Sequence, residues 1–217
     1  MGRRYDHRAW WPARTRVEMM AGAILTQRTR WESAAAAARR LRHGRLLRHG
    51  RLAAARAGSI AALIRPCGDH RTKARRLVAL ARFLDSHGGP AALAAWRTPV
   101  LRDALLAVQG IGPETADVIL LYAYHRPVFV ADAYALRFLG RVGFLRRARL
   151  APRYGAVHAR VTRLLADSAA ELADLHAVIV EHGKELCGPR PRCARCFLAP
   201  DCDYGRRLTE RSRPTGR

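Results

Sequence analysis

Apolar residues recur at intervals of three and four along almost the whole chain, mainly as Leu, Ala, Val and Ile. This spacing places them on one face of a helix, whereas a half-buried strand needs strict alternation. Alternation is nearly absent, and the one candidate, RPVFVAD at 126–132, fits a linker. The pattern therefore predicts an all-α fold. The predicted helices cover residues 16–27, 32–42, 70–89, 90–96, 99–108, 113–124, 132–141, 153–166 and 171–182, with a short helix in 58–68 whose N-cap is Ser59.

The stretch VQGIGPETADVIL at 108–120 predicts a hairpin that leads into a helix. Gly110, Ile111 and Gly112 form the hairpin, and Pro113 takes a first-turn position where its missing N–H costs nothing. A helix N-terminus of this kind is suited to bind a phosphate. Two glycines alone are weak evidence, and a dinucleotide-binding fold is disfavoured because no strand precedes them and no third glycine follows at the required spacing.

Positive charge far exceeds negative charge, since 40 Lys and Arg face 17 Asp and Glu for a net charge of +23. Such an excess favours a polyanionic partner, most often nucleic acid. A coding bias toward Arg and Ala, visible in RRLRHGRLLRHGRL at 39–52, explains arginine in place of lysine but not the shortage of acids. The 217 residues suffice for one large or two small domains. With no signal peptide or long apolar run, we expect a cytoplasmic, nucleoid-associated protein without a membrane partner.

Four of the five cysteines fall within 187–202, separated by five, two and five residues. In a reducing compartment such a cluster indicates metal. Zinc usually shows two close pairs, whereas one close pair flanked by single cysteines favours a [4Fe–4S] cluster; zinc stays the alternative. Arg190, Arg192 and Arg195 lie in the same loop, where they either contact phosphates or balance the thiolates. The fifth cysteine, Cys67, is expected to be a buried thiol. The expected ligands are Cys187, Cys193, Cys196 and Cys202.

Asp132 follows Glu114 by eighteen residues and opens a predicted helix. It fits an ordinary N-cap, and it also fits a carboxylate that faces the hairpin helix across a cleft. Together, VQGIGPETADVIL, FVADAYALRFLGR and CGPRPRCARC with a fourth cysteine resemble the helix-hairpin-helix DNA glycosylases of the endonuclease III superfamily, over residues 18–202. The resemblance implies a six-helix barrel with the hairpin (16–126) beside a helical domain built from both termini (1–15 and 127–217), which carries an iron–sulfur loop at 187–202.

The resemblance also implies roles for individual residues. Gly110, Ile111 and Gly112 would bind backbone phosphates, Asp132 would be the catalytic carboxylate, and Gln27 would fill the hole left by a flipped base. The four clustered cysteines would be the [4Fe–4S] ligands, although the first gap has five residues rather than the usual six. The implied partner is double-stranded DNA with a damaged base, bound by a monomer.

Glu114 is the main departure, because the lyase members of the superfamily have lysine there. A lysine amine attacks the sugar C1′ and forms a Schiff base, which a carboxylate cannot do. The chain has two lysines, Lys73 and Lys184, and neither lies in this motif. The sequence therefore predicts glycosidic cleavage without strand cleavage, with Asp132 stabilising positive charge on the sugar and orienting water. Asp132 and Glu114 are the candidate catalytic residues.

Three aromatic residues narrow the expected substrate. Trp10, Trp11 and Pro12 together with Trp31 resemble the aromatic pocket of the 3-methyladenine branch, which also has Glu in place of the lyase lysine. Such a pocket suits a cationic methylated base through stacking and cation–π attraction. The tryptophans fit core positions as well. Lys184 is the possible counterpart of a basic residue that aids the site in branch members without the cluster.

Three other functions remain open at this point. One is a bifunctional glycosylase and lyase for oxidised pyrimidines, which the missing lysine disfavours. Another is a protein that binds damaged DNA without chemistry. A redox-sensing regulator is the most distant, since the cluster is expected to be structural. The lesion itself is not specified by the sequence.

Overall fold

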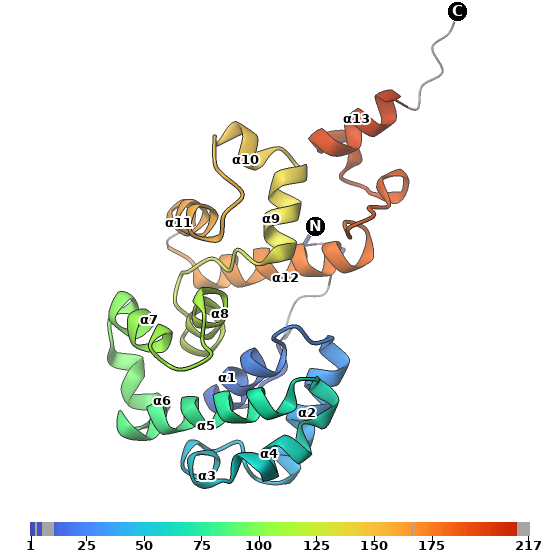
Figure 1. The fold of residues 1–217 in the computed structure, drawn as a ribbon. Helices are drawn as coiled ribbons and strands as arrows, with labels where there is room; N and C mark the ends of the chain where they lie inside the picture. Colours follow the sequence, from blue (N-terminus) through green and yellow to red (C-terminus); the bar gives the residue numbers. More distant parts are fainter. Residues whose placement is uncertain (3, 6–10, 166, 212–217) are drawn as a thin grey trace, which may run out of the picture. The chain divides into compact units, whose positions relative to one another are not determined.

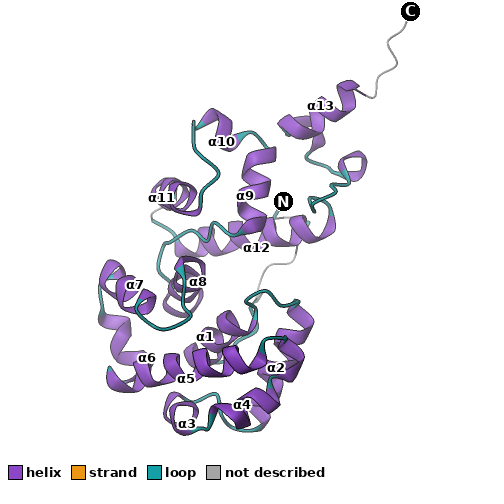
Figure 2. Ribbon diagram, viewed as in Figure 1, coloured by secondary structure: helices purple, strands orange, loops and turns teal. Residues whose placement is uncertain are grey.

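The computed structural model describes residues 1–2, 4–5, 11–165 and 167–211, with side chains as far as position 208. Every regular element in these ranges is a helix, and no strand occurs among them (Figure 2). The all-α fold is therefore confirmed. None of the described helices combines the length and the apolar character that a membrane crossing needs.

The chain divides into two compact units. Residues 11–126 form the first, called here the hairpin unit. Residues 127–211, with the described residues among the first ten, form the second, called here the cysteine unit. Residues 11–15, which the sequence analysis assigned with the termini, belong to the hairpin unit.

In the hairpin unit, α5 contacts α1 on one side and α3 and α4 on another, and α1 contacts α8 (Figure 1). The reason is the apolar face of α5, where Leu77, Leu80 and Leu84 are buried at helical spacing. The helices of this unit are α1 (Arg16–Leu25), α2 (Trp31–His43), α3 (His49–Ala54), α4 (Ala57–Leu63), η1 (Arg65–Cys67), α5 (His70–Ser86), α6 (Gly89–Ala92), η2 (Leu93–Ala95), α7 (Thr98–Leu106) and α8 (Pro113–Tyr124).

In the cysteine unit, α9 contacts α10, α12 and α13. The segment before α9 is irregular but deeply buried, and Phe129 and Val130 are fully enclosed. Side chains of α11 meet the backbone of Phe129, since Phe129 N donates to Thr162 Oγ1 at 2.8 Å and His158 Nδ1 lies 2.7 Å from Phe129 O. The helices of this unit are α9 (Ala133–Arg141), α10 (Phe144–Arg147), α11 (Tyr154–Leu164), α12 (Ala169–Glu185), η3 (Cys193–Arg195), η4 (Ala199–Asp201) and α13 (Asp203–Arg211).

Several predicted helix boundaries are wrong. Ser59 is not an N-cap, because α4 begins two residues earlier and Arg56 takes the cap position. Trp31 is the first residue of α2 rather than part of the break before it. The segment predicted as one helix at 90–96 divides into α6 and η2. The pattern also missed α3, α10 and α13. With six and four residues, α3 and α10 have too few turns to establish a periodicity, and α13 (DYGRRLTER) has too few apolar residues.

Candidate functional site

The hairpin between α7 and α8 leads into the N-terminus of α8, which no side chain caps. Gly110 has a φ of 87°, a conformation that favours glycine, and a Cβ there would overlap the side chain of Arg76. Ile111 is buried and anchors the turn. Gly112 is the N-cap of α8 in an extended conformation, no side chain caps it, and a Cβ there would meet no atom within 4 Å. The backbone N–H groups of the first turn of α8 are thus placed where an anion can reach them.

Gln27, the residue expected to fill the hole left by a flipped base, lies against this hairpin. Its Nε2 donates to Gly110 O at 3.1 Å and to Thr115 Oγ1 at 2.9 Å. Its Oε1 accepts from Arg76 Nη1 at 2.6 Å. If Gln27 fills the hole left by a flipped base, these hydrogen bonds must break first. Sequence reasoning missed Arg76, because only packing brings α5 to the hairpin.

A buried ion pair joins the two helices on either side of the hairpin. Arg102 of α7 donates to both carboxylate oxygens of Asp117 of α8, from Nε at 2.7 Å and from Nη2 at 3.0 Å. The Asp117 side chain is fully buried and that of Arg102 is 27% exposed. This two-point geometry fixes the direction of both helices relative to each other.

Glu114 lies exposed in the first turn of α8, where a carboxylate is favoured by the helix dipole. Neither lysine offers an exposed amine without a partner. Lys73 is buried, and its Nζ donates to Leu25 O at 2.8 Å, to Cys67 O at 3.0 Å and to Thr29 Oγ1. Burial lowers the pKa of Lys73. Lys184, on α12, forms an ion pair with Glu181 at 2.8 Å.

Asp132 is the N-cap of α9, as one of its two expected roles requires. Its Oδ1 accepts from Ala135 N at 2.8 Å. Its Oδ2 lies 3.6 Å from Nε2 of His176 on α12, and the Asp132 side chain keeps 15% of its surface exposed. His176 is buried on the same face of α12 as Leu172 and Ile179. The sequence offered no sign of this neighbour, since a histidine at an apolar helix position is indistinguishable from an ordinary core residue.

Trp11, Pro12 and Trp31 line one cavity of about 430 Å³ in the hairpin unit. Both tryptophans are only half-buried, so they are not simple core residues. The Trp11 ring lies 5.5 Å from that of Trp31 at 80°, and 5.5 Å from that of Tyr122 at 34°. Gly22 leaves room for Trp11 to lie against α1. The cavity has the volume of a small-molecule site. Trp10 lies outside the described residues.

Among the described residues, Glu18 of α1 is the one acidic side chain that lines this aromatic cavity, and it forms an ion pair with Arg42 of α2. Arg14 and Arg39 line the cavity as well. Glu18 also completes a capping arrangement, because Thr15 Oγ1 accepts from Glu18 N and Glu18 Oε2 accepts from Arg14 N, each at 3.1 Å. The carboxylate is thus committed to the start of α1 and to Arg42.

The four clustered cysteines, Cys187, Cys193, Cys196 and Cys202, line a single cavity with Phe138, His182 and Leu186. Burial raises the pKa of the Cys193 and Cys196 thiols. In the described part of the chain, no three or more His, Cys, Asp or Glu side chains are positioned to hold one metal ion. Cys67 is buried in the other unit, and burial raises its pKa, as expected of a structural thiol.

The cysteine loop is held by two arginines of α9, the helix that begins at Asp132. Arg137 Nε donates to Cys187 O at 2.9 Å. Arg141 Nη1 donates to Gly188 O at 2.6 Å and to Cys187 Sγ at 3.3 Å. Cys202 Sγ donates to Arg141 O at 3.4 Å. Sequence reasoning missed both arginines.

The three arginines of the loop itself behave differently from Arg141. Arg190, Arg192 and Arg195 are exposed, and none of them forms an ion pair or donates to a cysteine sulfur within the described residues. They are therefore available to an anionic partner.

An all-helical chain of high positive charge, with an anchored glycine hairpin at a helix N-terminus, defines a helix-hairpin-helix nucleic-acid-binding protein. Residues 21–166 match the HhH-GPD superfamily, described as base excision DNA repair proteins. The chain belongs to this superfamily, and the resemblance to the endonuclease III superfamily is confirmed.

Individual relatives cover nearly the whole chain. A candidate DNA repair glycosylase of Methanocaldococcus jannaschii is 35% identical over 91% of this chain and 90% of its own length. Endonuclease III of Thermotoga maritima is 28% identical over 87% of this chain and 83% of its own. Among solved structures, the Helicobacter pylori 3-methyladenine DNA glycosylase MagIII, bound to 1,N6-ethenoadenine, gives a TM-score of 0.67 with 26% identity, over 84% of this chain and 91% of that protein. The chain is therefore similar to DNA glycosylases over both of its units.

Proposed function

We propose that this base excision repair glycosylase is monofunctional and removes alkylated purines from duplex DNA. The proposal rests on one observation: no lysine stands in the hairpin motif, and the amines of the two lysines have partners elsewhere. Position 114 holds a carboxylate, and Lys73 is buried with three oxygen acceptors around its Nζ. Lys184 is engaged by Glu181. A lyase needs an amine that can reach C1′, so this distribution favours hydrolysis of the glycosidic bond alone.

Asp132 is the proposed catalytic carboxylate. Its Oδ1 is committed to the cap of α9, so Oδ2, on the side of His176, is the oxygen left to act on the sugar. As the bond between C1′ and the base nitrogen breaks, its electron pair leaves with the base and positive charge develops on the sugar. The Asp132 carboxylate stabilises that charge, orients the water whose oxygen then bonds to C1′, and accepts the proton that this water loses. A cationic alkylated purine leaves as a neutral base, so no acid is required to protonate it.

The aromatic cavity is the proposed base pocket. Trp11 and Trp31 present electron-rich rings, and a purine with a delocalised positive charge stacks on such rings more strongly than a neutral pyrimidine. The similarity to the 3-methyladenine glycosylase MagIII supports this choice. The similarity to endonuclease III leaves the bifunctional alternative as the one to test.

The four cysteines are the proposed ligands of a [4Fe–4S] cluster. Their convergence on one cavity, their spacing and the N–H donated by Arg141 to Cys187 Sγ suit a thiolate-bound cluster. When bound, the cluster would cross-link the loop 187–202 and would take no part in catalysis. Purified protein should contain about four iron atoms per chain. One zinc ion in their place would establish the alternative.

DNA contacts are proposed at two places. Gly110 and Gly112 offer backbone N–H groups to one phosphate, whereas Ile111 N donates to Val108 O at 3.0 Å, so Ile111 holds the turn instead of donating to DNA. The exposed Arg190, Arg192 and Arg195 offer charge to other phosphates. Reversing Arg190 and Arg192 to Glu should weaken binding of every duplex, whatever base it carries.

The deciding experiment combines base release with borohydride trapping. Duplexes that each carry one alkylated, oxidised or deaminated base are incubated with the protein, and free base, strand cleavage and the covalent adduct are measured separately. We expect release of alkylated purines, an uncut abasic strand and no adduct, because borohydride traps only an imine and a carboxylate forms none.

Glu114→Lys and Glu114→Gln form a matched pair in the same assay. Glu114→Lys should gain weak trapping, since an attack geometry off by about 1 Å costs about a hundredfold, whereas Glu114→Gln should gain none. A strong adduct in the wild type that disappears in Lys184→Ala would refute the monofunctional proposal. Release of oxidised pyrimidines in preference to alkylated purines would refute the substrate class.

A further inference from the structure

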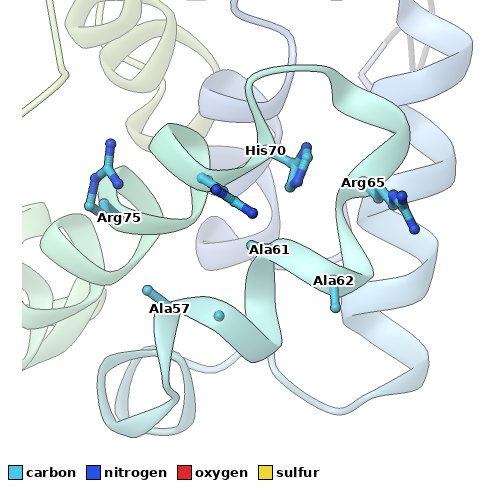
Figure 3. Close-up of a pocket in the computed structure, with 8 residues that line it drawn as sticks. Ala57, Ala61, Ala62, Arg65, His70 and Arg75 are labelled. Carbon is cyan, nitrogen blue, oxygen red and sulfur yellow. The ribbon is translucent and has the colours of Figure 1, made fainter.

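A second cavity of the hairpin unit, separate from the aromatic cavity, is surrounded by positive charge. It has a volume of about 640 Å³ and lies between α4, η1 and the first turn and a half of α5. Figure 3 shows Arg65, His70 and Arg75 around it. Arg71 completes the set of four basic side chains, and no acidic side chain lines the cavity.

These basic groups are not used inside the protein. Within the described residues, Arg65, His70 and Arg71 make neither an ion pair nor a side-chain hydrogen bond, and Arg75 donates only to Thr72 Oγ1 at 3.1 Å. The half-buried Arg102 of this unit behaves differently, since it is paired with Asp117. Like charges that share a cavity without a counterion repel one another, so the arrangement favours binding of an anion.

The rest of the cavity wall lets a bulky group approach. Ala57, Ala61 and Ala62 of α4 line the cavity together with the basic side chains. A Cβ at Gly58, which also lines the cavity, would meet no atom within 4 Å. Small side chains beneath exposed arginines leave space for a phosphate together with the sugar that bears it.

The same helix, α5, contributes one residue to the cavity and another that contacts the hairpin. Arg75 of α5 lines the cavity, and the next residue, Arg76, contacts Gln27 and the backbone of Gly110. Successive residues of a helix point about 100° apart, so the two sites lie on adjoining faces of α5. A ligand long enough to occupy both sites is a polymer with regularly spaced phosphates.

We propose that this cavity, which we call the α5 pocket, binds a phosphodiester group of the same DNA whose backbone the hairpin holds. The inference rests on the proposed function for the identity of the polymer. The α5 pocket adds charge-based contacts without reading a base, so it strengthens the binding of damaged and undamaged duplexes alike. A free phosphate or nucleotide shares the same chemistry, and the experiment distinguishes these sources.

The test is the salt dependence of binding to an undamaged duplex, followed by fluorescence anisotropy on the whole protein. The variant is Arg71→Gln with Arg75→Gln. The matched control is Arg82→Gln with Arg51→Gln, which removes the same charge from exposed residues outside the pocket, one of them on the same helix. Each lost phosphate contact lowers the slope of log K against log salt by about 0.9. We expect a loss of about one to two in the pocket variant and no change in the control.

The duplex used in this test is longer than the hairpin unit, so that it can occupy the hairpin and the pocket at the same time. Equal slopes for pocket variant, control and wild type on this duplex would overturn the proposal. Competition by inorganic phosphate or a mononucleotide that is lost in the pocket variant, with an unchanged DNA slope, would also overturn it in favour of a small ligand.

Failure of this proposal differs from failure of the proposed function. Binding to undamaged DNA does not depend on which base is excised, so an enzyme without alkylpurine release can still show the pocket effect. Equal melting temperatures of the pocket variant and wild type would confirm that both are folded, because the substituted residues carry no buried contact.

Discussion

The ion pair between Arg102 and Asp117 gives the sharpest energetic prediction. Arg102→Met keeps most of the aliphatic stem but removes the guanidinium from a carboxylate that is fully buried and accepts two hydrogen bonds from it. Removing one partner of a buried pair costs about 3–5 kcal/mol. Since each kcal/mol corresponds to about 2–4 °C in a domain of this size, the melting temperature should fall by roughly 6–20 °C.

The assay is thermal or urea unfolding followed by circular dichroism, with Asp103→Asn as the control. Asp103 lies next to Arg102 on α7 but is exposed, so its neutralisation should change stability by no more than about 0.5 kcal/mol. The double variant Arg102→Met with Asp117→Leu should be more stable than Arg102→Met alone, because it removes the buried charge as well. DNA affinity should fall in Arg102→Met, since the pair braces both helices that flank the hairpin. A stability loss below about 1 kcal/mol, the level of an exposed pair, would refute the reasoning.

Three further predictions follow from the contacts of single residues. Asp132→Asn should abolish base release in a single-turnover assay yet change the unfolding free energy by less than about 0.5 kcal/mol, because asparagine caps a helix as well as aspartate does; retained release would exclude Asp132 as the catalytic carboxylate. Lys73→Met should destabilise the protein in urea titrations by about 1–3 kcal/mol, because Leu25 O is left without its Lys73 donor while Cys67 O keeps the hydrogen bond from Thr29 Oγ1 at 2.7 Å, and an unchanged midpoint would contradict this. Arg141→Met should lose bound iron to a chelator faster than wild type, because three loop atoms lose their donor; equal rates would separate Arg141 from the proposed cluster.

Local features of the fold could be predicted from the sequence because they depend on neighbours within one or two turns. The helix at 113–124 begins and ends as predicted, and Asp132 caps the next helix. Gly110 takes the left-handed conformation that a hairpin demands. Cys67, which lies far along the chain from the clustered cysteines, is buried as predicted. Where the local signal was weak, as at Ser59, the predicted boundary was wrong, because packing rather than a capping side chain fixes the start of α4.

By itself, then, the sequence determined the helical fold, the hairpin, the cap at Asp132 and the superfamily, since apolar periodicity, glycines and short motifs are all written within a few residues of one another. Only the tertiary structure decided which groups meet. Lys73 bonds Leu25 across 48 positions, Asp132 lies beside His176, and Arg141 reaches Cys187 across 46 positions. Such contacts follow from the direction in which whole helices pack, and spacing along the chain carries no trace of that direction. The same holds for charge. The number of arginines can be read from the sequence, but burial and pairing in the tertiary structure decide which of them are available to DNA.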